Sequence, residues 1–352
     1  MEDALYGVSA LRYHRTPPQV LALMPPVPPV EGDRCRFELR KHPLVRGVLR
    51  MPLHFFVTNR AEHTFAQYAC CHLQSGELPF GSVVETQHGF NVSSPAMTLF
   101  QLARSLPVTQ VAMAMYEMCG SFTVFDLSGL PQELSSQVDV AGSLYAGAWR
   151  NVRRPDGRPS DLWNRSPLVE LSELEQLAKD MRGRRGCRVF ERALERVTGV
   201  VASPFEAQLS LLLATPRAAG GEGLRSFSNN ARIVLSGKAA RLAGRYNCYA
   251  DFLFEETGDK KPLVVECQGR LVHGGADASM SDSDRTTALQ QMGYNVMLLT
   301  YQQIADAKNF DIVRHMLFEE IGLKYREKTE RQLDAQRNLR RELFIDWNTL
   351  GR

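Results

Sequence analysis

Three polar side chains stand in two runs of residues that otherwise have the pattern of buried strands. Asp251 lies inside YADFLFEE, and Glu266 and Gln268 lie at the end of LVVECQ. Side chains alternate along a strand, so Glu266 and Gln268 share one face, while Cys267 points to the other. The turn-rich sequence EETGDKKP connects the two runs. An antiparallel pairing of the strands would therefore bring Asp251 opposite Glu266 and Gln268.

Two carboxylates at one edge of a sheet favour a bound divalent cation. Like charges repel each other and are costly to bury unless a cation joins them. Carboxylate oxygens are hard ligands that suit Mg²⁺ or Mn²⁺, and such an ion can activate water and stabilise charge at phosphorus. Glu206, one turn into the preceding apolar helix, is a further candidate, for a metal-bound water or a second ion. The alternative is that Asp251 and Glu266 are polar strand-end residues with ordinary partners, and these residues support both interpretations about equally.

A small α/β unit is predicted to hold these residues in place. Ser203 and Pro204 have the residue types that cap and begin a helix, which continues through FEAQLSLLLA. The other predicted elements are strands at 249–256, 262–269 and 294–300 and a helix at 281–292. The order helix, strand, strand, helix, strand is typical of an α/β sandwich.

Residues 200–305 resemble the PD-(D/E)XK nuclease superfamily. Within it they are most similar to the domain-of-unknown-function 559 family, which is related to very-short-patch-repair (Vsr-type) endonucleases. The residues that carry the resemblance are, in chain order, Ser203, Glu206, Asp251, Val265, Glu266, Gly269, His273, Asp282, Arg285, Leu289, Gly293 and Val296. The resemblance implies a three-layer α/β/α, restriction-endonuclease-like core and, in active members, Mg²⁺-dependent phosphodiester cleavage.

Roles for individual residues follow from the resemblance. Asp251 and Glu266 are implied to be metal ligands, with the main-chain carbonyl of Cys267 joining them, and Glu206 is the acidic residue of the first helix. Gln268 departs from the pattern, because many superfamily nucleases have lysine there and this family usually has aspartate. A glutamine can orient water but cannot act as its base at neutral pH.

His273 and the nearby arginines are candidates for supporting roles. His273 lies one place later than the usual family spacing and is interpreted as a proton-transfer group, a residue behind the ligands, or a solvated loop histidine. The net charge is only +3, from 42 basic and 39 acidic residues, so a DNA-binding protein of this composition must concentrate its positive charge. We expect Arg270, Arg285 and Lys238 to contribute DNA contacts at the rim of the site. The arginines between 182 and 196 would extend a basic track.

The predicted domains are 1–125, 126–199, 200–308 and 309–352. The first is an α+β domain with a strand at 52–58, a hairpin that turns at Gly89 and a helix that Ser94 caps. Through HRTPP, SSPAMTLFQLA and YEMCG it resembles a region that precedes such nuclease-like domains and is likened to AbiEi-type antitoxins of abortive-infection systems. The second is interpreted as a pattern-poor linker and helical connector, the third as the nuclease-like domain, and the last as a charged helical segment, either an exposed arm or a packing helix.

Composition limits the remaining function classes. No apolar run reaches the ~18 residues that a membrane span needs, and the N-terminus lacks the apolar stretch of a secretory signal. The seven cysteines include no CxxC, which argues against a zinc ribbon or a disulfide framework. We therefore expect a cytoplasmic protein with no membrane partner.

Three functions are consistent with the sequence. The leading one is a Mg²⁺- or Mn²⁺-dependent DNA endonuclease of the Vsr-like class, in phage defence or DNA repair, with RNA as the other candidate substrate. The alternative is a non-catalytic, antitoxin-like DNA-binding regulator that keeps the nuclease fold as a scaffold, with a toxin or another protein as partner. The third is a protein-interaction module. Gln268 favours the second function, whereas the three carboxylates together favour the first.

Overall fold

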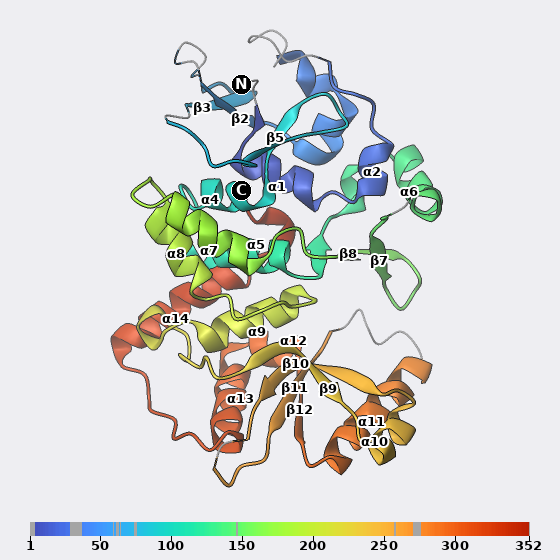
Figure 1. Ribbon diagram of the computed structural model, residues 1–352, viewed down its shortest axis with the longest axis vertical. Helices are drawn as coiled ribbons and strands as arrows, with labels where there is room; N and C mark the ends of the chain where they lie inside the picture. Colours follow the sequence, from blue (N-terminus) through green and yellow to red (C-terminus); the bar gives the residue numbers. More distant parts are fainter. Residues whose placement is uncertain are drawn as a thin grey trace.

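The computed structural model describes residues 4–28, 37–58, 60, 63, 65–73, 76–145, 147–256, 258–269 and 276–351, apart from the side chains of 276–282. Within these residues the fold is α/β, as the sequence predicts. The strands form three sheets, and helices pack between and around them (Figure 1). No helix in this described part of the chain is long and apolar enough to cross a membrane.

The N-terminal part is built on a five-stranded sheet of order β3-β2-β1-β5-β4. Its strands are β1 (Ala4–Leu5), β2 (Leu53–Val57), β3 (Ala69–Leu73), β4 (Val83–Glu85) and β5 (Asn91–Ser93). The helices are α1 (Gly7–Arg15), α2 (Pro18–Ala22), α4 (Pro95–Leu102) and α5 (Val108–Cys119), with short helical turns η1 (Leu39–Lys41) and η2 (Val45–Leu49). The predicted hairpin around Gly89 is confirmed, and Ser94 caps α4 by accepting a hydrogen bond from the Met97 N–H at 3.3 Å.

Residues 126–168 fold into regular elements, so the prediction of a pattern-poor linker is wrong for them. They contain η4 (Leu127–Gly129), α6 (Gln132–Leu144), β7 (Arg150–Arg153) and β8 (Pro159–Asn164). Strand β8 pairs with β6 (Phe122–Val124) as well as with β7, so a three-stranded sheet crosses the boundary predicted at residue 125. The sequence pattern is weak because these strands are short and α6 fully buries only Val138.

The connector is helical at its end, as predicted, but the helical run is divided into two helices; it leads to a second α/β unit. The helices are α7 (Leu171–Asp180) and α8 (Cys187–Leu194). The unit contains α9 (Pro204–Ala214), η5 (Arg217–Ala219), β9 (Ser228–Val234), α10 (Gly237–Ala243), β10 (Asn247–Phe254), β11 (Leu263–Gln268), α11 (Ala276–Gln291) and β12 (Asn295–Thr300). Its sheet has the order β12-β11-β10-β9, with β11 and β12 parallel and the other pairs antiparallel.

This four-stranded sheet is covered on both faces. Ala240 of α10 and Leu289 of α11 pack with Val264 in one apolar cluster. On the other face, Phe252 and Val265 belong to the large core that also includes most of α9. The three-layer α/β/α arrangement expected for this part of the chain is therefore present (Figure 1).

The charged C-terminal segment is a packing element and not an exposed arm. It comprises α12 (Tyr301–Ala305), α13 (Ala307–Glu320), α14 (Glu330–Leu343) and η6 (Trp347–Thr349). Leu343 and Trp347 are buried in the core shared with α5 and α9. The last described residues lie against α1, close to the N-terminal sheet (Figure 1). The C-terminal segment thus joins the N-terminal part to the second α/β unit.

A buried ion pair fixes this junction. Arg15 of α1 donates to Glu117 of α5 from Nε at 3.0 Å and also from Nη2, and both side chains are almost completely buried. Glu117 Oε1 accepts from the hydroxyl of Thr123 at 2.6 Å and from the N–H of Val124 at 3.0 Å. Arg15 also donates to the main-chain carbonyl of Trp347 at 3.0 Å. The Arg15–Glu117 pair therefore connects α1, α5, β6 and η6.

Replacing Glu117 should destabilise the protein strongly. Glu117→Ala leaves the Arg15 guanidinium buried without its counter-charge, which typically costs about 3–5 kcal/mol. Asp139→Ala is the matched control, because Asp139 forms an exposed pair with Arg153 that is worth at most about 1 kcal/mol. Urea unfolding gives the free energy of unfolding of both variants. If both variants lose the same small amount of unfolding free energy, the Arg15–Glu117 pair does not stabilise the junction.

Candidate active site

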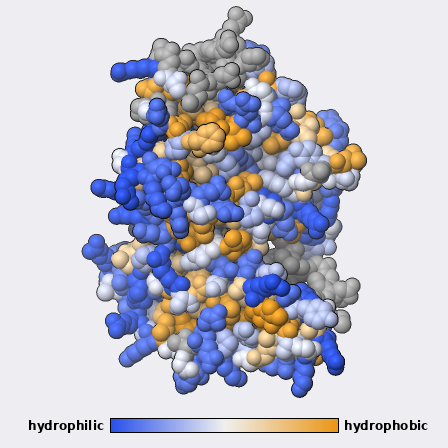
Figure 2. All heavy atoms as spheres, viewed as in Figure 1, coloured by the Kyte–Doolittle hydropathy of each residue, from blue (hydrophilic) through white to orange (hydrophobic). Residues whose placement is uncertain are grey.

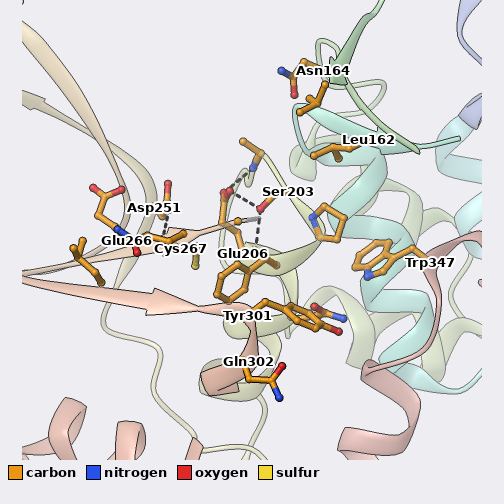
Figure 3. A pocket seen from close by; sticks show the side chains of 18 of the residues that line it. Leu162, Asn164, Ser203, Glu206, Asp251, Glu266, Cys267, Tyr301, Gln302 and Trp347 are labelled. Carbon is orange, nitrogen blue, oxygen red and sulfur yellow. Dashed lines mark hydrogen bonds between the residues drawn. The ribbon is translucent and has the colours of Figure 1, made fainter. Parts of the chain in front are cut away.

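Six of the predicted site residues line a cavity of about 1470 Å³. Its walls come from the β6–β8 sheet, the first turn of α9, the ends of β10 and β11, helix α11, the β12–α12 junction and η6 (Figure 3). Glu206, Asp251, Glu266, Cys267, Gln268 and Arg285 are all among the lining residues. These six residues, singled out from the sequence, therefore lie around one cavity.

Antiparallel pairing places Asp251 beside Glu266, as the sequence predicts. Phe252 pairs with Val265 in the β10–β11 ladder, and Asp251 and Glu266 are the next residues on the two strands. The Asp251 carboxylate accepts a hydrogen bond from the main-chain N–H of Cys267 at 2.7 Å. This bond orients the carboxylate beside the end of the β10–β11 ladder, where Figure 3 shows it between the side chains of Glu266 and Glu206.

Glu266 is buried and paired with a cation. Its side chain is about 4% exposed, and its Oε2 accepts from Nη2 of Arg285 on α11 at 2.8 Å. Cys267, the next residue on β11, packs instead against the core on the other face of the sheet, so the predicted alternation is confirmed. Arg285 thus neutralises Glu266 from the α11 side.

Glu206 is a buried acid with an unusual proton affinity. Ser203 caps α9 by accepting from the Glu206 N–H at 3.2 Å, and this places the Glu206 carboxyl in the first turn. The carboxyl accepts from the Ser203 hydroxyl at 2.7 Å and from the Ala202 N–H at 2.8 Å. Burial, and next the negative charge of Asp251, raise the pKa of Glu206 to about 8. The carboxyl therefore keeps its proton at pH 7 while no cation is near it.

The described lining of the cavity is acidic, which differs from the predicted basic rim. Its acids are Asp161, Glu206, Asp251, Glu266 and Asp346, and Arg285 is the one lysine or arginine among the described lining residues. Lys238 lies exposed on α10, and neither it nor any arginine of 182–196 lines the cavity. Most of these arginines lie exposed on α8 or just before it, and Figure 2 shows a hydrophilic surface in this part of the molecule. Arg270 and His273 lie outside the described residues.

The oxygen donors of the site have the chemistry that a hard cation needs. Asp251 raises the pKa of Glu206, so a divalent ion between them would relieve an existing repulsion. Carboxylate oxygens and the Cys267 carbonyl are ligands of the type Mg²⁺ and Mn²⁺ take. As they stand, however, the described residues include no group of three His, Cys, Asp or Glu side chains arranged to hold a metal. An ion that uses Glu266 must therefore compete with Arg285.

Several lining residues were not predicted from the sequence. They include Leu162 and Asn164 of β8, Gln208 of α9, Tyr301 and Gln302 of α12, and Trp347 of η6. Strand pairing offers a signal for two of them: Thr300 pairs with Gln268 in parallel β12 and β11, so the residues after Thr300 reach the same sheet edge. The others come from segments whose position depends on long-range packing.

Raising the pH should destabilise the metal-free wild type more than Glu206→Gln. Between the ordinary pKa of 4.5 and the folded-state pKa of about 8, the folded protein holds one proton more than the unfolded chain, so stability falls as pH rises. Urea unfolding in EDTA gives the free energy of unfolding at pH 5 and pH 9. Between these pH values, wild type should lose on the order of a few kcal/mol more than Glu206→Gln. Glu256→Gln, at an exposed acid on the β10–β11 connection, is the control. If the free energy of unfolding changes equally with pH in wild type and Glu206→Gln, the pKa of Glu206 is not raised.

Comparison with known proteins gives no match for this chain. No protein-family model matches it, no curated protein matches it, and no solved structure matches it.

Proposed function

We propose that this protein is a divalent-cation-dependent hydrolase of phosphodiester bonds in DNA. The observation that carries the proposal is the meeting of Asp251, Glu266 and Glu206 in one cavity, from two paired strands and a helix N-terminus (Figure 3). Clustered carboxylates, one of which has a raised pKa as Glu206 does, are typical of sites that bind cations or move protons. The resemblance to Vsr-like PD-(D/E)XK nucleases, with its three-layer core, supports the same conclusion.

Each residue has a part in this proposal. Asp251 and Glu266, with the Cys267 carbonyl, would hold the cation, which supplies an activated water and charge stabilisation at phosphorus when bound. Glu206 would give up its proton as the cation approaches and hold a metal-bound water. Gln268 would orient the attacking water through its amide. Arg285 balances the charge of Glu266 in the absence of a cation.

The acidic lining makes the cation a condition of substrate binding. A polyanion is repelled by the carboxylates on the described walls, and divalent cations reverse that local charge. A cytoplasmic role in phage defence or DNA repair is the setting that fits such an enzyme. RNA is the competing substrate, and the assay below includes it.

A second candidate function is a non-catalytic, antitoxin-like DNA-binding regulator. The ion pair between Arg285 and Glu266, at 2.8 Å, favours it, because a scaffold needs its buried carboxylate neutralised and needs no metal. Gln268, which carries no charge, favours it too. A toxin or another protein would then be the partner of this regulator. If the protein binds neither DNA nor RNA, the third function, a protein-interaction module, is favoured.

Glu266→Ala should abolish metal-dependent nicking while DNA binding persists. The assay uses supercoiled plasmid, linear duplex, single-stranded DNA and RNA, each with Mg²⁺, Mn²⁺ or EDTA. Wild type should nick weakly, and the variant should lose at least ~10²-fold in rate, because an electrostatic partner of the transition state is removed. Glu256→Ala is the control with an exposed acid. If wild type binds DNA but no metal yields cleavage of any substrate, the regulator is the correct function.

Gln268→Lys should preserve or raise the cleavage rate. A lysine beside the metal ligands restores a cation that stabilises the attacking water, and loss of such a partner typically costs ~10²–10³ in rate. Gln290→Lys adds the same charge elsewhere on the cavity lining and serves as the matched control. An equal rise in both variants would show a general effect of charge on DNA binding. No change in either, in a protein without activity, supports the scaffold.

A further inference from the structure

The wall of the cavity that faces the carboxylates has a different character. Figure 3 shows Leu162 and Trp347 on the far side of Glu206 from Asp251 and Glu266, with Tyr301 below Trp347 in this view. The apolar and aromatic lining residues include Val124, Val152, Leu162, Phe205, Tyr301, Ile345 and Trp347. None of these side chains can hold a cation through oxygen in the way a carboxylate does, so this wall serves another part of a ligand.

Apart from the Glu266–Arg285 pair, two buried polar atoms of lining residues have no hydrogen-bond partner among the described residues. They are Nε1 of Trp347, a donor, and Oε1 of Gln208, an acceptor. Their side chains are 6% and 2% exposed, and both are held firmly. Gln208 donates through Nε2 to the Leu343 carbonyl at 3.1 Å, and Arg15 binds the Trp347 carbonyl at 3.0 Å. Buried polar groups normally find partners, so a donor and an acceptor left unmatched beside a cavity point to a ligand.

Tyr301 offers a flat aromatic surface in the same cavity. Its ring makes edge contacts with Phe205, at 5.9 Å between centroids, and with Phe344, at 6.2 Å. These contacts fix the orientation of the ring, yet the residue is 39% exposed. A fixed and partly exposed tyrosine is the kind of side chain on which single-stranded nucleic acids stack their bases.

The charges of the cavity decide which part of a nucleotide enters. Phosphates are excluded from an acidic interior unless a cation is present, and the candidate ligands for such a cation are the carboxylates of Glu206, Asp251 and Glu266. A base is planar, uncharged and edged with hydrogen-bond donors and acceptors. It matches a wall with an aromatic ring, an N–H donor and a carbonyl acceptor.

We propose that this wall binds one unpaired base of the substrate, stacked on Tyr301 and hydrogen-bonded by Trp347 and Gln208, while the adjacent phosphate lies at the carboxylates. The substrate class is therefore single-stranded or locally unpaired DNA. A base in an intact duplex would first have to be unstacked and unpaired, which lowers duplex affinity. This inference rests on the proposed function, because it assumes that DNA is the ligand.

The test measures binding by fluorescence anisotropy in Ca²⁺, with a labelled single strand, the same strand in a duplex, and single strands that carry one abasic residue at successive positions. Wild type should bind the single strand at least tenfold more tightly than the duplex. Tyr301→Ala should weaken single-strand binding roughly 5- to 150-fold, the range found for base stacking. Tyr301→Phe keeps the ring and should bind like wild type.

Two comparisons separate base recognition from a structural effect. The abasic residue should weaken binding at one position, and there Tyr301→Ala should cause no further loss, because both changes remove the same contact. Trp347→Phe keeps a ring but removes the N–H, and it should weaken binding of the intact strand several-fold more than binding of the abasic strand. Tyr249→Ala, at an exposed aromatic outside the lining, is the control and should not change affinity.

The outcomes distinguish the two proposals. Equal affinity for single strand and duplex, or losses from Tyr301→Ala and the abasic residue that simply add, overturn base binding and leave the nuclease proposal standing. Failure of every DNA substrate to bind in Ca²⁺ and in Mg²⁺ overturns both proposals. A single-strand preference with coupled losses supports base binding even if no cleavage is found.

Discussion

The pairing of Arg15 with Glu117 is the interaction on which the architecture of the cavity depends. A buried carboxylate must be fully satisfied, and Glu117 is satisfied by Arg15 together with Thr123 and Val124 of β6. Because Arg15 also binds the Trp347 carbonyl, the same few contacts set the position of η6. Strand β6 and η6 supply the wall that faces the carboxylates. The geometry of the site is therefore controlled by charges that lie outside it.

The acidic half of the site could be predicted from the sequence because its determinants are local. Strand periodicity gives the faces of Glu266 and Cys267, and a short connection implies the antiparallel pairing that brings Asp251 beside them. The serine and proline at the start of α9 fix the first turn, and with it the position of Glu206. Each of these inferences depends only on residues a few positions apart or on the pairing of two successive strands. Sequence patterns are most reliable at such short range.

The rest of the site depends on contacts between distant segments. Residues 126–168 have no clear pattern because short strands and an exposed helix bury few side chains each. Arg285 has the spacing of a motif residue, but its ion pair with Glu266 depends on how α11 packs over the sheet. The acidic lining emerges only when Asp161 of β8 and Asp346 before η6 join the strand carboxylates. No local sequence pattern around Asp161 or Asp346 indicates that they line the same cavity as Asp251 and Glu266.

The position of Trp347 in the chain has a consequence for biosynthesis. A ribosome makes residues 204–268, with all three carboxylates, well before it makes η6, which closes the opposite wall. Segments fold as they emerge, so the α/β unit forms first with its acidic edge open to solvent. The contact of Arg15 with the Trp347 carbonyl joins residues 332 positions apart and comes among the last. A nascent chain that ends before η6 therefore carries Glu206, Asp251 and Glu266 without Trp347, and a translation product truncated there would lack this part of the cavity wall.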